Sequence, residues 1–451
     1  MLTSHRVTRT LLATASALVL VLSVTGWVAS EKYLSGLSTV NVFGGLAGTS
    51  AWSGEPMNIL LVGTDDRTGL TKEQRRETTI ERTDAGRHTD TMLLVHLGGG
   101  LGTVSVISIP RDSLVDIPGH TSPEGEHIPA HKGKVNSAFA TGGPAVTVSA
   151  VAQATGVTID HYVEINFGGF LNMVNAVGGV EVCLPEALQD QRARLDLPAG
   201  RQTIQGADAL AYVRARYIDN DFGRAQRQQK FLAAMLQRVM SSGVLANPVT
   251  MNSLVDSVTS SVTTDERLNR DEIAAFAARA ADLDLSRINF TTVPVSDGNF
   301  MHEGESTVLW DGPAAAEMFT ALNSDQPLPK ETKATVVDIA PGDIHVALSG
   351  DVNQLTAAKQ DLTDAGYQVT LNPATESAAA TTTTVTYDPA LPDSLKTLKA
   401  AFPNATFAQE PGMGETFAIG IGSDYAGVKP VRSASTSLET TVRTAKDNLC
   451  S

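Results

Sequence analysis

A carboxylate and an arginine flank two apolar segments in the first third of the chain. The first segment begins at Asp90 and reads Asp-Thr-Met-Leu-Leu-Val-His-Leu; a glycine-rich turn follows, and the second segment ends in Ile-Pro-Arg at Arg111. Apolar, β-branched segments separated by glycines predict neighbouring antiparallel strands, so we expect Asp90 and Arg111 at the same edge of a sheet. A carboxylate can hold a hard cation and a guanidinium can bind phosphate, so this pair indicates phosphate-ester or pyrophosphate chemistry.

Two further carboxylates follow another predicted strand. The apolar segment Asn-Ile-Leu-Leu-Val after Met57 ends in Gly-Thr-Asp-Asp, which places Asp65 and Asp66 at a sheet edge. Loops at such edges commonly carry binding and catalytic residues. The alternative is that these aspartates serve turn chemistry alone, which is common after Gly-Thr.

Basic residues gather in a second region of the chain. Arg214 and Arg216 point to one side only if the backbone between them is extended, because on a helix they would lie about 200° apart. A long helix is predicted from Gly223, with Arg224 and Gln228 one turn apart on one face. Arginine at a helix N-terminus opposes the helix dipole, and a bound anion would remove that conflict. The alternative for these arginines is surface ion pairing, which contributes little to stability.

Composition limits the classes of function. The chain has 451 residues, a net charge of -15 and 42% hydrophobic residues, which describes a globular protein of two or three domains. Such a charge argues against a nucleic-acid partner, since phosphate contacts need a basic surface. The two cysteines, Cys183 and Cys450, are too few for a disulfide-rich scaffold or a zinc site with four thiolates, although they could pair in an oxidising compartment.

The N-terminal segment predicts the compartment. Residues Thr10 to Ser30 are uncharged and, as a helix rising about 1.5 Å per residue, would span one hydrocarbon core. Arg6 and Arg9 precede this segment, so we expect a single-pass membrane anchor with its N-terminus cytoplasmic and the rest of the chain extracytoplasmic. The alternative is a cleaved signal peptide.

Strand and helix patterns alternate along the rest of the chain. They predict an α/β layered catalytic domain with a central mixed sheet flanked by helices, followed by a small α+β domain. A helix is expected from Pro144 to Thr155, and the polar stretch from Thr68 to Arg87 is expected to be an exposed loop. We divide the chain into a cytoplasmic leader (1–9), an anchor (10–30), a linker (31–55), the catalytic domain (56–325), the C-terminal domain (333–427) and a polar, mobile tail (428–451).

Several short motifs occur in one order, and together they resemble the LytR-CpsA-Psr family of Gram-positive cell-wall proteins. They are Asn-Ile-Leu-Leu-Val-Gly-Thr-Asp-Asp-Arg from Asn58, Thr-Asp-Thr-Met from Thr89, Ser-Ile-Pro-Arg-Asp-Ser from Ser108, Lys-Val-Asn-Ser-Ala from Lys134, Tyr-Val-Arg-Ala-Arg from Tyr212 and Arg-Ala-Gln-Arg-Gln-Gln from Arg224. Residues 333–427 resemble, more loosely, the C-terminal domain of many members.

The resemblance implies an enzyme that moves a glycopolymer phosphate from a polyprenyl-pyrophosphate carrier in the membrane to peptidoglycan, leaving a phosphodiester bond. It implies Mg²⁺, with Mn²⁺ as a substitute, held on the pyrophosphate by Asp65 or Asp66 together with Asp90. The same resemblance assigns the remaining roles to three sets of residues. The catalytic set is Arg111, Arg214, Arg216 and Asp90; the pyrophosphate-binding set is Arg87, Lys134, Arg224 and Gln228; and the walls of a lipid groove are Phe167, Phe170, Val174, Phe231 and Met235.

Two departures from the family pattern and two other functions stay open. His88 stands where members often have arginine, so Arg87 or His88 would serve that position. Arg201 stands where some members have a second cysteine, so we expect Cys183 to be a buried thiol rather than half of that disulfide. With water as acceptor the same site would make a pyrophosphatase, and without turnover the protein would bind carrier lipid or cell wall. The polymer could be capsule, teichoic acid or arabinogalactan.

Overall fold

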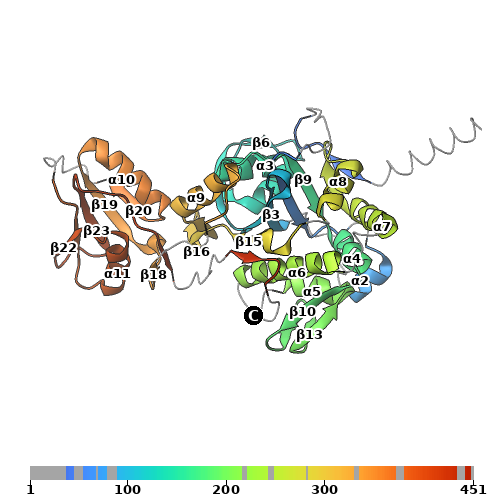
Figure 1. Ribbon diagram of the computed structural model, residues 1–451. Coiled ribbons are helices and arrows are strands. Elements are labelled where there is room, and N and C mark those ends of the chain that lie inside the picture. Colours follow the sequence, from blue (N-terminus) through green and yellow to red (C-terminus); the bar gives the residue numbers. More distant parts are fainter. Residues whose placement is uncertain are drawn as a thin grey trace, which may run out of the picture.

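The computed structural model describes two α/β domains joined through a short connection (Figure 1). The described residues are 37–44, 54–67, 70–78, 89–215, 221–241, 248–280, 283–329, 335–371, 380–433 and 442–447. The expected leader and membrane anchor lie outside these residues. Within them, no helix is both long and apolar enough to cross a membrane.

The catalytic domain is built on a mixed sheet of eight strands, in the order β1-β14-β9-β2-β3-β4-β15-β25. The expected mixed sheet flanked by helices is therefore confirmed. Strands β2, β3 and β4 form its antiparallel centre, whereas β9 runs parallel to β2 and β15 runs parallel to β4. The strand bounds are β1 Ser38–Val40, β2 Met57–Thr64, β3 Thr89–Leu97, β4 Val104–Ile109, β9 His161–Ile165, β14 Val262–Asp265, β15 Ile288–Thr292 and β25 Arg443–Thr444.

Alternating side chains of the central strands face two separate layers of helices. In β3, Met92 and Leu94 pack on α3 (Val135–Thr155) and α9 (Gly312–Asn323), whereas Leu93 packs on α6 (Asp221–Ser241). This alternation follows from the two-residue period of a strand. The helices α7 (Pro248–Thr259) and α8 (Arg270–Ala280) pack on each other. Helix α3 begins before the expected Pro144 and crosses it with a kink at Gly143.

A satellite core lies beside α6. Its elements are α4 (Phe167–Ala176), α5 (Gly206–Arg214) and two short hairpins, and it packs around Val174, Tyr212 and Phe231. The hairpins pair β10 (Val180–Leu184) with β13 (Gly200–Ile204), and β11 (Leu188–Asp190) with β12 (Leu195–Leu197). Helix α6 therefore contacts the central sheet on one side and the satellite core on the other.

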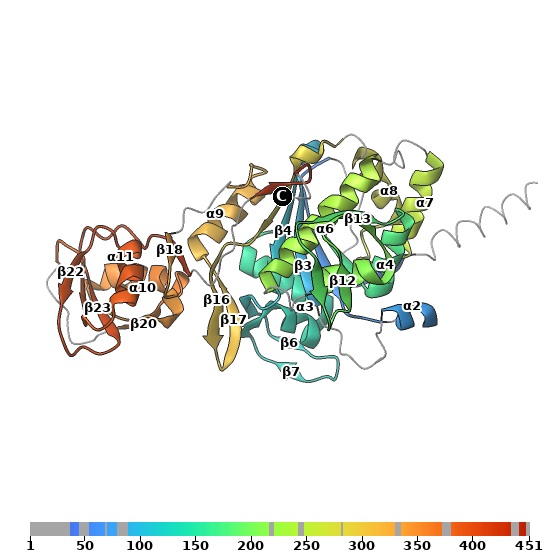
Figure 2. The same cartoon turned by 90° about the horizontal axis from the view of Figure 1, so that it is seen from below.

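Two excursions leave the central sheet. After β4 the chain forms the short strands β5 (Leu114–Ile117), β6 (His120–Thr121), β7 (His127–Ile128) and β8 (His131–Lys134). After β15 it forms a long hairpin, β16 (Val295–His302) and β17 (Glu305–Trp310), which projects between the two domains (Figure 2). The hairpin joins the first excursion through a bridge between Ser113 and Val308.

The C-terminal domain has a five-stranded sheet in the order β20-β19-β23-β21-β22. Its strands are β19 (His345–Gly350), β20 (Gln368–Leu371), β21 (Thr384–Tyr387), β22 (Thr406–Gln409) and β23 (Thr416–Ile421), and its helices are α10 (Val352–Asp364) and α11 (Pro392–Ala401). β18 (Thr335–Val337) pairs in parallel with β24 (Val431–Ser433) at the connection. The expected small α+β domain is therefore found.

Three segments differ from the sequence-based expectation. Ser38–Val40, placed in the linker, forms the edge strand β1 paired with β14, because its β-branched residues meet an open sheet edge. The loop expected over residues 68–87 contains helix α2 (Lys72–Glu77), which starts from a capping box between Thr71 and Gln74. The described part of the tail, which was expected to be mobile, includes β25, which pairs with β15, and Ala445 is fully buried beside it.

The expectation for Cys183 is wrong. Cys183 on β10 is disulfide-bonded, and no free cysteine occurs in the described part of the chain. The sequence contains one other cysteine, Cys450, which lies outside the described residues. Half-burial at the edge of a small hairpin leaves the sulfur of Cys183 accessible to a partner, and sequence spacing could not reveal this.

Candidate active site

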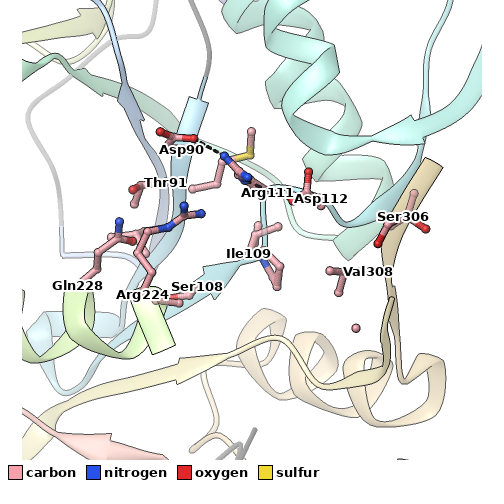
Figure 3. A pocket seen from close by; sticks show the side chains of 16 residues that line it. Asp90, Thr91, Ser108, Ile109, Arg111, Asp112, Arg224, Gln228, Ser306 and Val308 are labelled. Carbon is pink, nitrogen blue, oxygen red and sulfur yellow. Dashed lines mark hydrogen bonds and ion pairs between the residues drawn. The ribbon is translucent and has the colours of Figure 1, made fainter. Parts of the chain in front are cut away.

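The carboxylate and the arginine that flank the central hairpin meet as expected. Register pairs Met92 with Ile109, so the first residues of β3 and the residues after β4 lie at one edge of the sheet. Arg111 Nη1 donates to Asp90 Oδ1 at 2.6 Å, and Arg111 Nε donates to Asp112 Oδ2 at 3.3 Å (Figure 3). The prediction of a shared edge is confirmed, and the guanidinium is oriented by two carboxylates.

Helix α6 brings two more polar side chains to the same edge. Arg224 lies in its first turns and is 5% exposed, and Gln228 lies one turn further on (Figure 3). The helix is held in position by its glutamines: Gln228 Nε2 donates to Val213 O at 3.1 Å, and Gln229 Nε2 donates to Ser108 Oγ at 2.8 Å. These bonds fix the start of α6 against both α5 and β4.

A cavity of about 530 Å³ opens between the sheet edge, α4, α5 and α6. We call it the main cavity. Its polar end includes Asp65, Asp90 and Arg111, together with Arg214, Arg224 and Gln228. Arg214 is the last residue of α5, and its guanidinium carbon lies 4.8 Å from the centre of the Phe167 ring. The structure thus brings residues from five separated motifs to one opening.

The rest of the main cavity is apolar. Four of the five predicted groove residues line it, namely Phe167, Phe170, Phe231 and Met235. The rings of Phe170 and Phe231 lie 5.5 Å apart at a tilt of 36°, a favourable aromatic arrangement. Further apolar lining comes from Leu61, Leu93, Ile165, Met173, Leu210, Val213 and Leu232. The main cavity therefore offers an apolar channel that ends among charged groups.

Several predicted residues lie elsewhere. Val174 does not line the main cavity; it is fully buried in the satellite core, because its position on α4 faces β10. Asp66 lies beside Asp65 but does not line the cavity. Lys134 precedes α3, and its Nζ lies 3.2 Å from Glu305 Oε2 of the β16–β17 hairpin, away from the main cavity. Arg87 and Arg216, with His88, lie outside the described residues.

Sequence reasoning missed other lining residues. Arg192 and Asp190 reach the main cavity from the β11–β12 hairpin, where Asp190 Oδ1 accepts the Arg192 backbone N–H at 2.9 Å. Their only signal is an Asp followed by a turn, which is common in loops without function. Asp112, next to Arg111, belongs to one of the sequence motifs, but its type and position alone predict no role of its own.

The carboxylates limit which metals could be held. Asp65 and Asp90 line one cavity, but within the described ranges no group of three or more His, Cys, Asp or Glu side chains is placed to hold a metal. Mg²⁺ usually takes one or two carboxylates and completes its shell with water and substrate phosphates. The donor set fits such a partly protein-held ion, and it does not fit an all-protein zinc or calcium site.

Comparisons with known proteins identify the family of the chain. The LytR_cpsA_psr family model matches residues 38–324. Cell wall biosynthesis protein LcpA of Corynebacterium glutamicum is 32% identical over 402 residues, which is 81% of this chain and 76% of that protein. Polyisoprenyl-teichoic acid–peptidoglycan teichoic acid transferase TagU of Enterococcus faecalis is 34% identical, over 43% of this chain and 57% of that protein.

A solved structure supports the fold. The crystal structure of protein gbs0355 from Streptococcus agalactiae matches with a TM-score of 0.50 and 21% identity, covering 61% of this chain and 90% of that one. At this identity the likeness concerns the fold alone. The family match covers more than half of the chain, including the sheet edge and the main cavity, and the chain belongs to the LytR-CpsA-Psr family.

Proposed function

We propose that this protein transfers a glycopolymer phosphate from a polyprenyl-pyrophosphate carrier to peptidoglycan. One observation carries the proposal: the apolar main cavity ends at a cluster of three arginines and two aspartates, which are Arg111, Arg214, Arg224, Asp65 and Asp90. A lipid-linked pyrophosphate has the same polarity, with a long apolar chain ending in concentrated negative charge. The Enterococcus faecalis relative is named for a polyisoprenyl-linked donor and a peptidoglycan acceptor, which is the same class of reaction.

The reaction needs positioning more than covalent help from the protein. An acceptor hydroxyl attacks the phosphorus that bears the glycan, a new P–O bond forms, and the bond to the bridging oxygen breaks. Polyprenyl phosphate leaves with the electron pair, and the hydroxyl proton is released. Such transfer depends on neutralising charge on the equatorial and leaving oxygens. Arg111, held by Asp90 and Asp112, and Arg224, fixed at the start of α6, supply that charge.

Asp65 and Asp90 are the residues that would hold Mg²⁺ at the polar end of the main cavity. When bound, the ion would neutralise charge on the pyrophosphate oxygens. Asp90 would then serve two purposes, because its Oδ1 also accepts from Arg111 Nη1. Metal dependence is therefore part of the proposal, with Mn²⁺ as an expected substitute.

The proposed location follows from the donor. A polyprenyl carrier stays in the bilayer, so an enzyme that uses it must work at the membrane surface. The uncharged segment from Thr10 to Ser30 would anchor the protein there, with the catalytic domain on the extracytoplasmic side.

A direct test uses the full chain in detergent micelles, a short-chain polyprenyl-pyrophosphate disaccharide and a peptidoglycan oligosaccharide. The reaction is run with magnesium or with chelator, and mass spectrometry detects a phosphodiester-linked product. We expect the product to require magnesium. Asp90→Asn should lower its formation at least tenfold, while Asp393→Asn, a matched change in an exposed ion pair with Lys396, should leave it unchanged.

The outcomes separate the alternatives. Release of polyprenyl phosphate and glycan phosphate in the presence of acceptor, with no linked product, would replace transfer by hydrolysis. Donor that stays bound and unchanged would replace it by lipid binding. A linked product that still forms in the presence of chelator would show that transfer occurs without a metal ion, so the metal dependence alone would be wrong.

A further inference from the structure

A second, smaller cavity reaches the Asp90–Arg111 pair from the opposite side to the apolar channel. It has a volume of about 160 Å³ and is bounded by β4, the residues after it, and the β16–β17 hairpin. We call it the hairpin cavity. It shares Asp90, Thr91, Leu93, Arg111, Arg224 and Gln228 with the main cavity, and its own walls include Asp112, Gly298 and Ser306. Charged groups at the centre of the site are therefore accessible from two directions.

The two cavities differ in size and length. The main cavity, of about 530 Å³, continues into a channel of phenylalanine, leucine and methionine side chains. The hairpin cavity, of about 160 Å³, is short and is lined by Met92, Ile109, Pro110 and Val308 as well as by the polar residues Ser108, Asp112, Ser306 and Thr307. Figure 3 shows Asp112 between Arg111 and the hairpin, with Ser306 on the facing strand. A long lipid chain fits only the main cavity, whereas the short hairpin cavity has room for one hydroxyl-bearing group beside Asp112 and Ser306.

We propose that the hairpin cavity is the subsite for the acceptor, and that it takes the hydroxyl-bearing end of a carbohydrate. This inference rests on the proposed function. In phosphoryl transfer the attacking and leaving oxygens are roughly in line with the phosphorus. With the leaving lipid phosphate in the main cavity, the acceptor hydroxyl approaches the phosphorus from the side opposite the leaving oxygen, and the hairpin cavity opens toward that side beside β4. The hydroxyl oxygen bonds to phosphorus, its proton is released, and polyprenyl phosphate departs into the apolar channel.

The wall of this subsite is fixed from both sides. Val308 N donates to Asp112 O at 2.8 Å, and Glu305 at the tip of the hairpin pairs with Lys134 at 3.2 Å. On its other face the hairpin packs against the C-terminal domain, where a Cβ added to Gly342 would come within 2.8 Å of Asp297 Oδ2 and of the Phe300 ring. Lys134 Nζ also lies 3.9 Å from Asp112 Oδ1, so Lys134 links the end of the hairpin to a residue of the cavity wall.

The test fills the cavity without altering the charged groups. The series Ser306→Val, Ser306→Leu and Ser306→Trp is compared with Met301→Trp, a change on the same hairpin at a side chain that is 59% exposed and outside the cavity. Initial rates of product formation are measured against acceptor and against donor concentration. We expect KM for the acceptor to rise with side-chain size, by at least tenfold for tryptophan, while KM for the donor and donor hydrolysis by water stay within twofold.

Three results would overturn the proposal. If the unmodified chain forms no linked product, the proposed function is wrong, and the acceptor subsite that rests on it is wrong as well. If the unmodified chain transfers and the Ser306→Leu variant, folded by its melting temperature, has an unchanged KM for acceptor, the subsite alone is wrong. If Met301→Trp raises that KM as much as Ser306→Trp does, the effect belongs to the hairpin as a whole and not to the cavity.

Discussion

The two domains of this protein have similar layered folds, but the carboxylates at their strand ends have different roles. Both contain a mixed sheet with helices, but in the C-terminal domain the aspartates at strand ends serve the domain's own backbone. Asp424 Oδ1 accepts from Thr383 N at 2.7 Å, and Asp388 Oδ2 accepts from Gly412 N at 2.8 Å. Backbone hydrogen bonds from Ala390 and Gly412 lower the pKa of the Asp388 carboxyl. Here the carboxylates stabilise turns.

In the catalytic domain the corresponding carboxylates face cavities instead. Asp65 and Asp90 lie at strand ends near the start of α6, where α4, α5 and α6 enclose the main cavity together with the sheet edge. Fold class therefore does not determine the site. The difference is that α5 and α6 bring Arg214 and Arg224 to a cavity at the edge of the catalytic sheet.

The largest difference between the two domains should appear when one cation is removed from each of them in turn. Arg111→Ala should lower kcat for transfer about 10²–10³-fold, which is typical for losing one preorganised group that stabilises developing charge. Lys399→Ala removes a cation that lies 5.7 Å from the Phe407 ring of the C-terminal domain, and it should leave kcat unchanged. Steady-state kinetics with both variants measures the contrast.

Arg111→Lys sharpens this prediction. Lysine keeps the charge but loses the two-point contact with Asp90 and Asp112, so its kcat should lie between those of the wild type and the alanine variant. Equal rates for the wild type and Arg111→Ala would show that the cluster at the sheet edge is structural, as the carboxylates of the C-terminal domain are.

Local sequence patterns predicted much of the catalytic core. The alternation in residues 90–109 predicts two strands, and the glycines between them set an antiparallel register, so the meeting of Asp90 and Arg111 follows from residue order and strand geometry. The long helix predicted from Gly223 is likewise found, as α6. These features depend on residues close in sequence.

Features that depend on distant pairing could not be predicted this way. Strands β1 and β25 complete the two edges of the catalytic sheet from opposite ends of the chain. The β16–β17 hairpin turns through Glu303 and Gly304, both with positive φ, and a Glu-Gly pair is a weaker turn signal than Asn-Gly or Asp-Gly. Ser306 therefore could not be linked to Arg111, because only the packing of the hairpin on the excursion after β4 brings them to one cavity.

A smaller effect should test whether the two cores unfold separately. Ile419→Val in the C-terminal sheet and Ile107→Val in the catalytic sheet each remove one methyl from a fully buried side chain, at a cost of about 0.5–1.5 kcal/mol. The same cost shifts the melting temperature more in a domain of about a hundred residues than in one over twice that size. Calorimetry should therefore show Ile419→Val lowering the transition of the smaller domain, with kcat unchanged. A single transition lowered equally by both variants would show that the domains unfold together.

The smallest effect should appear as opposite pH responses of two buried aspartates. Burial raises the pKa of Asp297 at the domain junction, and the charge of nearby Asp343 raises it further. Ionisation of the Asp297 carboxyl therefore lowers the stability of the folded protein as pH rises above 3.8. Burial alone would raise the pKa of Asp265 in β14, but hydrogen bonds from His161 and from backbone N–H groups outweigh burial and lower this pKa. The ionised Asp265 carboxylate therefore stabilises the folded protein fully at neutral pH, and this stabilisation is lost as pH falls below 3.8. Melting curves at pH 7 should show Asp297→Asn above the wild type, by less than the isoleucine changes, and Asp265→Asn below it. The Asp297→Asn gain should shrink toward pH 4, and a gain that stays constant with pH would mean that its carboxyl does not titrate differently in the folded protein.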